Sequence, residues 1–119
     1  MRHMVLIRLD PTTIPEGGPD ADMVSEITAL LEEMTKAGVL LDTNGLRPIE
    51  EATRLRQRPD GSAAVVDGPF TETKEIIGGY LLLQTRSTEE ATEWSSRFLR
   101  LHDPSWDVEL ELRQLDHQD

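Results

Sequence analysis

The segment "VVDGPFTETKEIIGGYLLL", Val65 to Leu83, decides the fold of this chain because two extended runs meet in it. The first run ends at Asp67-Gly68-Pro69-Phe70. These residues favour a tight turn, because Asp can accept hydrogen bonds from backbone N–H groups, Gly permits φ values that other residues rarely adopt, and Pro fixes φ. The second run, Ile76 to Thr85, predicts a strand, and Gly78-Gly79 near its start indicates a β-bulge.

Upstream of this segment the sequence predicts a hairpin and a strand. Pro59-Asp60-Gly61 is a strong turn signal between the extended runs of "EATRLRQRPDGSAAVVDG", residues 51–68. Before the hairpin, "VLLDTNGLRPI" (residues 39–49) reads as a strand that runs into a bend at Asn44-Gly45.

The N-terminal third predicts a strand, a loop and a helix. Residues 2–9 form the first strand, and residues 10–20, with three prolines and two glycines, predict a long surface loop without regular structure. A helix follows, with Asp20 or Asp22 as its cap and Gly38 as its stop. Its apolar stripe at helical spacing is Met23, Ile27, Leu30, Leu31 and Met34.

Downstream of the segment the pattern predicts a second helix and a last strand. Ser87-Thr88-Glu89-Glu90 has the spacing of a capping box. The stripe of the helix that follows is Ala91, Trp94, Ser95 and Phe98, and the helix ends near His102-Asp103-Pro104. From Trp106 to Leu112 apolar and acidic residues alternate, which predicts a strand with one buried face.

The resulting order is strand, helix, strand, hairpin, strand, helix, strand. Without the hairpin this is βαββαβ, so we expect an α+β, ferredoxin-like fold with an inserted β-hairpin. Two helices cover one face of an antiparallel sheet. A second subunit is the expected cover of the other face, because a domain of this size has a limited core.

The length, composition and net charge of the chain exclude several classes of function. The 119 residues fit one domain, 1–119, and the absence of Cys excludes disulfides and thiolate chemistry. A net charge of −11 argues against direct contact with nucleic acid or anionic membranes. The short apolar run Met4 to Leu9 fits neither a secretory leader nor a membrane span, so a cytoplasmic location is expected. No metal-ligand spacing or phosphate-binding loop is found, so no cofactor is expected.

The long run Asp67 to Glu75, followed by Ile77-Gly78-Gly79-Tyr80, resembles the YCII-related family, specifically the subgroup named for its DGPF motif. Supporting segments are "AGVLLDTNGLRP" and "STEEATEW". The resemblance implies a ferredoxin-like domain that forms a dimeric α/β barrel through its sheets, with a cleft beside the interface. It also implies a genetic link to extracytoplasmic-function sigma factors.

One branch of this family is similar to a dehydrochlorinase, and some members carry a His–Asp pair proposed as catalytic. The family's histidine would fall around Asp20 to Met23, where this chain has no His, so that pair is not carried over. Three functions stay open. The first is a dimeric small-molecule-binding domain with an auxiliary or regulatory role. The second is a cofactor-independent lyase or isomerase with Asp67 as general base. The third is a protein-interaction module that uses the acidic surface.

The candidate site residues surround the opening segment. Asp67 is either a turn residue or a catalytic base. Charged residues outside a regular period are typical of binding loops, so Glu72 and Lys74 are candidate ligand-binding residues, together with Phe70, Asn44 and Arg47. Arg54, Arg56 and Arg58 share one face of a strand, where they either hold an anion or form an exposed surface that deters aggregation.

Overall fold

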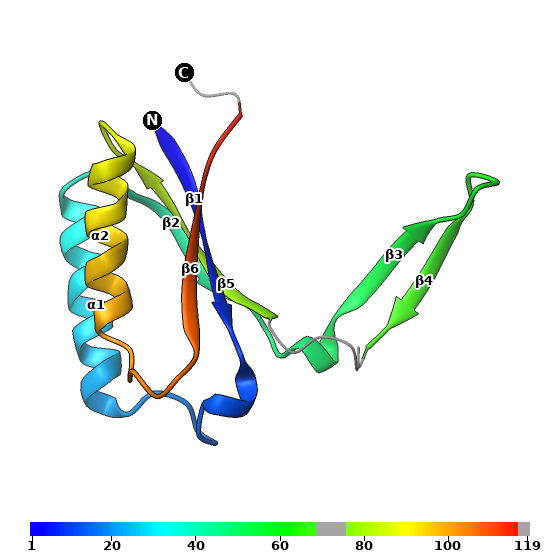
Figure 1. Ribbon diagram of the computed structural model, residues 1–119, viewed down its shortest axis with the longest axis horizontal. Coiled ribbons are helices and arrows are strands. Elements are labelled where there is room, and N and C mark those ends of the chain that lie inside the picture. Colours follow the sequence, from blue (N-terminus) through cyan, green and yellow to red (C-terminus); the bar gives the residue numbers. More distant parts are fainter. Residues whose placement is uncertain (69–75, 117–119) are drawn as a thin grey trace.

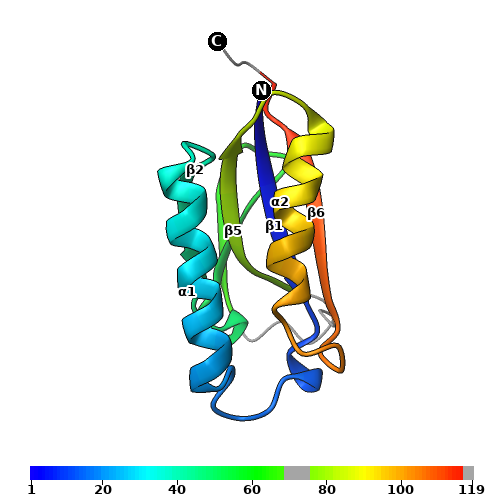
Figure 2. The same cartoon turned by 90° about the vertical axis from the view of Figure 1, so that its left-hand side faces the viewer.

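In the computed structural model, the chain forms a four-stranded sheet with two helices on one face, and a separate hairpin (Figure 1). The structure describes residues 1–68 and 76–116. The strands of the main sheet are β1 Arg2–Leu9, β2 Leu40–Gly45, β5 Ile76–Gln84 and β6 Val108–Gln114. The helices are α1 Ala21–Lys36 and α2 Thr88–Arg100, which lie side by side over the sheet (Figure 2).

The sheet has the strand order β2-β5-β1-β6, and all of its neighbouring strands are antiparallel. Helix α1 joins β1 to β2 with β5 between them, and α2 joins β5 to β6 with β1 between them. This interleaving of two βαβ units is the ferredoxin-like arrangement, so the fold predicted from the sequence is confirmed.

Helix α1 begins and ends where its sequence signals predict. The side chain of Asp20 accepts a hydrogen bond of 2.8 Å from the N–H of Met23, so Asp20 rather than Asp22 is the cap. After the last turn, Gly38 has a φ of 75°, a conformation that costs little only for glycine. The N–H of Val39 then bonds to the carbonyl of Met34 at 2.9 Å and leads the chain into β2.

Helix α2 carries the predicted capping box in a shifted form. The Ser87 hydroxyl accepts a bond of 3.1 Å from the N–H of Glu90, as predicted. The Glu90 carboxylate, in return, accepts from the N–H of Arg86 at 3.2 Å. The reciprocal bond therefore lies one residue before the position that a capping box normally uses.

The hydrophobic core lies between the sheet and the helices. Side chains alternate along a strand, so Val5 of β1 and Leu81 and Leu83 of β5 all point toward the helices and are fully buried. The buried apolar residues are Val5, Leu30, Met34, Val39, Leu81, Leu83, Ala91 and Phe98. The predicted stripes contribute to this core or pack against it, except that Met23 at the start of α1 is only half-buried and is not part of the cluster.

The predicted β-bulge is present at the start of β5. Ile7 lies opposite Gly79 and Arg8 lies opposite Ile77, so Gly78 is the extra residue. A Cβ atom on Gly79 would lie 2.8 Å from the carbonyl oxygen of Asn44. Glycine at position 79 therefore allows β2 to approach β5 closely.

Four features differ from the sequence prediction. Asn44 and Gly45 are paired with β5 inside β2 and do not form the predicted bend. The loop after β1 contains a short 3-10 helix, η1 Pro11–Thr13, which Asp10 caps. A second one, η2 Ile49–Glu51, replaces the start of the predicted hairpin. The last strand begins at Val108 rather than Trp106, because the N–H of Trp106 closes a turn onto the carbonyl of Asp103 at 3.0 Å.

The inserted hairpin is formed by β3 Thr53–Gln57 and β4 Ala63–Asp67, and we call residues 53–67 the arm. Its strands pair only with each other, through the predicted turn in which the N–H of Gly61 bonds to the carbonyl of Arg58 at 2.9 Å. The arm extends from the side of the sheet that faces away from the helices (Figure 1). The radius of gyration is accordingly 16.4 Å, compared with about 13.5 Å for a compact domain of this length.

Candidate functional site

The face of the main sheet that has no helices, which we call the open face, is the centre of the candidate site. Along β1 and β5 the side chains of Met4, Leu6, Tyr80 and Leu82 alternate with the core residues and therefore point to the open face. Met4 lies opposite Leu82, and Leu6 lies opposite Tyr80. All four are only partly buried within one chain. The open face thus has an apolar centre.

A polar cluster lies beside this apolar centre, on β2 and β5. The hydroxyl of Tyr80 donates a hydrogen bond of 2.6 Å to Oδ2 of Asp42 and accepts one of 3.1 Å from Nδ2 of Asn44. The second carboxylate oxygen of Asp42 accepts from the N–H of Thr43 at 2.9 Å. We call Asp42, Asn44 and Tyr80 the tyrosine cluster.

A hollow of about 260 Å³ lies next to the tyrosine cluster, where the chain leaves β2. Its lining residues are Leu46, Arg47, Pro48, Ile49, Glu51, Ala52 and Ile77. Most of the lining is apolar. The exception is the ion pair in which Arg47 contacts the carboxylate of Glu51 at 2.8 Å. The hydrogen bond that Arg47 donates to this carboxylate raises the pKa of Arg47, so its guanidinium stays charged at the rim of the hollow.

The first half of the DGPF motif closes the base of the arm. Asp67 is exposed at the end of β4, and its Oδ1 accepts a hydrogen bond of 3.0 Å from the hydroxyl of Thr53. The N–H of Gly68 bonds to the carbonyl of Ala52 at 2.9 Å. A Cβ atom on Gly68 would lie 3.1 Å from the carbonyl oxygens of Ile49 and Glu50, so glycine lets the arm pack against η2.

The structure therefore brings part of the predicted site together. Asn44 belongs to the tyrosine cluster, Arg47 lines the hollow, and Asp67 precedes the glycine that touches η2. The predictions for Phe70, Glu72 and Lys74 fall outside the described residues. Sequence reasoning missed Asp42 and Tyr80 as site residues.

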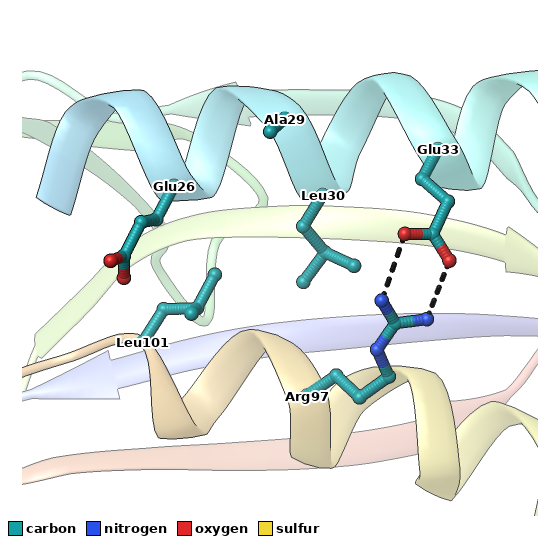
Figure 3. Close-up of a pocket in the computed structure, with 6 residues that line it drawn as sticks. All are labelled: Glu26, Ala29, Leu30, Glu33, Arg97 and Leu101. Carbon is teal, nitrogen blue, oxygen red and sulfur yellow. Dashed lines mark hydrogen bonds and ion pairs between the residues drawn. The ribbon is translucent and has the colours of Figure 1, made fainter. Parts of the chain in front are cut away.

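A second hollow, of about 300 Å³, lies between α1 and α2 on the far side of the sheet (Figure 3). Across it, Arg97 and Glu33 form two hydrogen bonds of 2.7 and 2.8 Å. The hydrogen bond from Arg97 lowers the pKa of Glu33. The guanidinium also lies 4.9 Å from the centre of the Trp94 ring. Because Glu33 and Arg97 satisfy one another, this pair links the two helices across the hollow, while Glu26 lines the hollow at its other end.

Within residues 1–68 and 76–116, no group of three His, Cys, Asp or Glu side chains is arranged to hold a metal ion. None of the helices there is long and apolar enough to span a membrane.

The fold and the open face define a class of protein: small α+β domains with two helices on one face of an antiparallel sheet. The YCII-related domain model matches residues 1–101, and this chain belongs to that family. The chain is also 33% identical, over 76 residues, to an uncharacterised protein of Rhizobium meliloti (strain 1021). That match spans 64% of this chain and 60% of the relative, so the chain covers well under two thirds of the relative's length.

Proposed function

We propose that this protein is a dimeric small-molecule-binding domain with an auxiliary or regulatory role, and that its ligand lies at the open face. One observation carries the proposal: the open face combines a partly exposed apolar centre with a polar cluster and an apolar hollow at one end. Small-molecule sites are typically apolar hollows with a few convergent polar groups.

The homodimer forms through the sheet faces. Met4, Leu6 and Leu82 make an apolar centre that no element of the described chain covers, and a second copy would remove it from water. The arm extends on the same side of the sheet (Figure 1), so a second copy seated on the open face would also meet the arm.

The arm supports this dimer independently. Leu55 and Val65 lie opposite each other on β3 and β4 and are 71% and 64% exposed. An isolated two-stranded hairpin is only marginally stable in water. A second copy that packs against this apolar pair would stabilise the arm and bury the exposed side chains.

The ligand site is proposed at the end of the open face where β2 leads into η2. Asn44 and Arg47 contribute from the described part of the chain. Phe70, Glu72 and Lys74 complete the proposed lining on sequence grounds. The link to extracytoplasmic-function sigma factors rests on the resemblance of the DGPF run, and co-purification of this protein with such a sigma factor from its host cell tests it.

The ligand proposal is tested by a metabolite screen that measures the melting temperature. A ligand that binds only the folded state stabilises it by about 2.7 kcal/mol at 100 times its Kd, which is several degrees for a domain of this size. We expect at least one small molecule to raise the melting temperature with a dose dependence. A Leu46→Asp variant, with a charge in the hollow, should lose the effect. A broad screen without any hit would contradict the proposal.

The alternative function is a lyase or isomerase that uses Asp67 as general base. It is suggested by the position of Asp67 in the DGPF run, one residue before the contact of Gly68 with η2. The carboxylate is exposed in one chain, so a bound substrate or a second copy would have to supply the burial that tunes a carboxylate for this role. In this case Asp67→Asn should abolish turnover of the identified substrate while leaving its binding intact. Full activity in Asp67→Asn would remove Asp67 from the mechanism.

A further inference from the structure

The tyrosine cluster has a composition that selects the chemistry of its ligand. We propose that it recognises a protonated amine carried on a small apolar body, with the ammonium on Asp42, Asn44 and Tyr80 and the body in the adjacent hollow. The inference rests on the proposed function, because it assumes that a small molecule binds at the open face.

The first argument comes from counting hydrogen-bond positions. The Tyr80 hydroxyl has one donor and two acceptor positions; its proton goes to Asp42 and one acceptor position is filled by Asn44. One acceptor position on the tyrosine oxygen remains. Each oxygen of Asp42 also accepts one described bond and has room for another. The cluster therefore presents mainly acceptors, which require a ligand with N–H or O–H groups.

The second argument is charge. Within residues 1–68 and 76–116, Asp42 has no cation within ion-pairing distance, whereas Glu51 is paired with Arg47 and Glu33 with Arg97. The net charge of the whole chain is −11. A negative surface attracts small cations and repels small anions. An ammonium group satisfies both the missing countercharge and the free acceptor positions, because it carries three donors and no acceptor.

The third argument is the shape of the adjoining surface. Leu46, which lines the hollow, lies two residues after Asn44, and its N–H bonds to the carbonyl of Gly78 at 2.8 Å. The hollow therefore begins just beyond the Asn44 end of the cluster. Leu46, Ile49 and Ile77 supply much of its apolar wall. A volume of about 260 Å³ accommodates one ring or a short aliphatic chain.

A purely structural role is the competing interpretation, because the cluster also joins the edge strand β2 to β5. The two strands are already paired by their backbones from Leu40 to Gly45. If the hydrogen bonds only hold β2 in place, then removing the Tyr80 hydroxyl would lower the melting temperature without changing ligand affinity. The test therefore measures stability and affinity separately.

The experiment compares three probes of similar size on the full chain by isothermal titration calorimetry: phenethylammonium, 2-phenylethanol and 3-phenylpropionate. We expect binding to weaken in that order, with at least a tenfold difference between the amine and the carboxylate. Asp42→Asn should weaken binding of the amine at least tenfold and reduce the preference over the alcohol. Tyr80→Phe should weaken amine binding by a smaller factor.

Glu32→Gln is the matched control, since it removes the same charge from the exposed surface of α1. It should leave the affinities unchanged. The inference is overturned if the amine does not bind at millimolar concentration, if the carboxylate binds as well as the amine, or if Asp42→Asn binds the amine normally. The proposed function fails separately, when the broad metabolite screen finds no ligand of any charge.

Discussion

The body of the molecule and its arm both consist of antiparallel strands but differ in the burial of their apolar side chains. In the body, Val5 and Leu81 are 0% exposed beneath two helices, whereas in the arm Leu55 and Val65 are 71% and 64% exposed. The comparison teaches that an extended apolar run predicts a strand but not the layer that covers it. A strand buries its apolar side only where a second layer exists, and the arm has no such layer within one chain.

The apolar side chains of the open face are intermediate in exposure between those of the core and those of the arm. Met4, Leu6, Tyr80 and Leu82 are partly buried by their neighbours in the sheet, yet no helix covers them. The arm extends beside this same face (Figure 1). One additional layer, supplied by a second copy, would therefore complete both regions.

The largest expected loss of stability follows a substitution in the core of the body. Leu81→Ala should lower the free energy of unfolding by about 2–5 kcal/mol, because it leaves a cavity in a fully buried position. Leu55→Ala in the arm should change it by no more than about 0.5 kcal/mol when the protein is dilute enough to be monomeric. Urea denaturation at equilibrium measures both values, and equal losses would contradict the contrast between the regions.

The next largest loss of stability is expected where β2 approaches β5 closely. Gly79→Ala should destabilise the fold by about 1–3 kcal/mol, because the new Cβ meets the backbone oxygen of Asn44 at 2.8 Å. Gly78→Ala is the control, since its Cβ would meet only the movable end of the Leu9 side chain. Thermal unfolding should show the larger shift for Gly79→Ala; the reverse order would show that the register at the bulge is wrong.

A third effect belongs to the arm and should change association more than stability. The double change Leu55→Asp and Val65→Asp should weaken the dimer at least tenfold, because it would place carboxylates in the proposed contact. Val24→Asp is the matched control, as Val24 is 48% exposed on α1, on the other side of the sheet. Sedimentation velocity over a dilution series measures both, and unchanged association in the double variant would remove the arm from the interface.

The smallest effect is the pH dependence of the contact between the helices. The hydrogen bond from Arg97 lowers the pKa of Glu33, so the carboxylate stabilises the folded state above its ordinary pKa of about 4.3. This contribution is lost as the pH falls through the lower, folded-state pKa. Arg97→Gln should therefore lower the melting temperature slightly at pH 7 and by a smaller amount at pH 3. If the variant and the unmodified protein differ in melting temperature by the same amount at both pH values, the Glu33 carboxylate does not provide this stabilisation.

The fold was predictable because its signals are local. Asp20 and Gly38 mark the ends of α1, Ser87 marks the start of α2, and the pair Gly78-Gly79 marks the bulge in β5. The predicted start of β6 was wrong by two residues. Trp106 fits the alternating pattern of the strand, but its N–H bonds to the carbonyl of Asp103 in a turn instead of to a neighbouring strand.

The site was less predictable because it depends on strand pairing. Asn44 meets Tyr80 only when β2 lies beside β5, 36 residues further along the chain. The sequence indicates both strands but not their register, and the bulge in β2 after Leu40 determines that Asp42 and Asn44 both face the open side. Asp42 and Tyr80 were therefore missed.

The most direct test of the account is sedimentation equilibrium of the intact protein at about 10–50 µM, a range in which specific dimers with Kd values of about 1 µM are populated. The chain mass is 13.4 kDa. If a second copy covers the open face and the arm, the measured mass will be about twice this value and will fall when Leu6→Lys is introduced on the open face. A mass of one chain at these concentrations, unchanged by that substitution, would contradict the account.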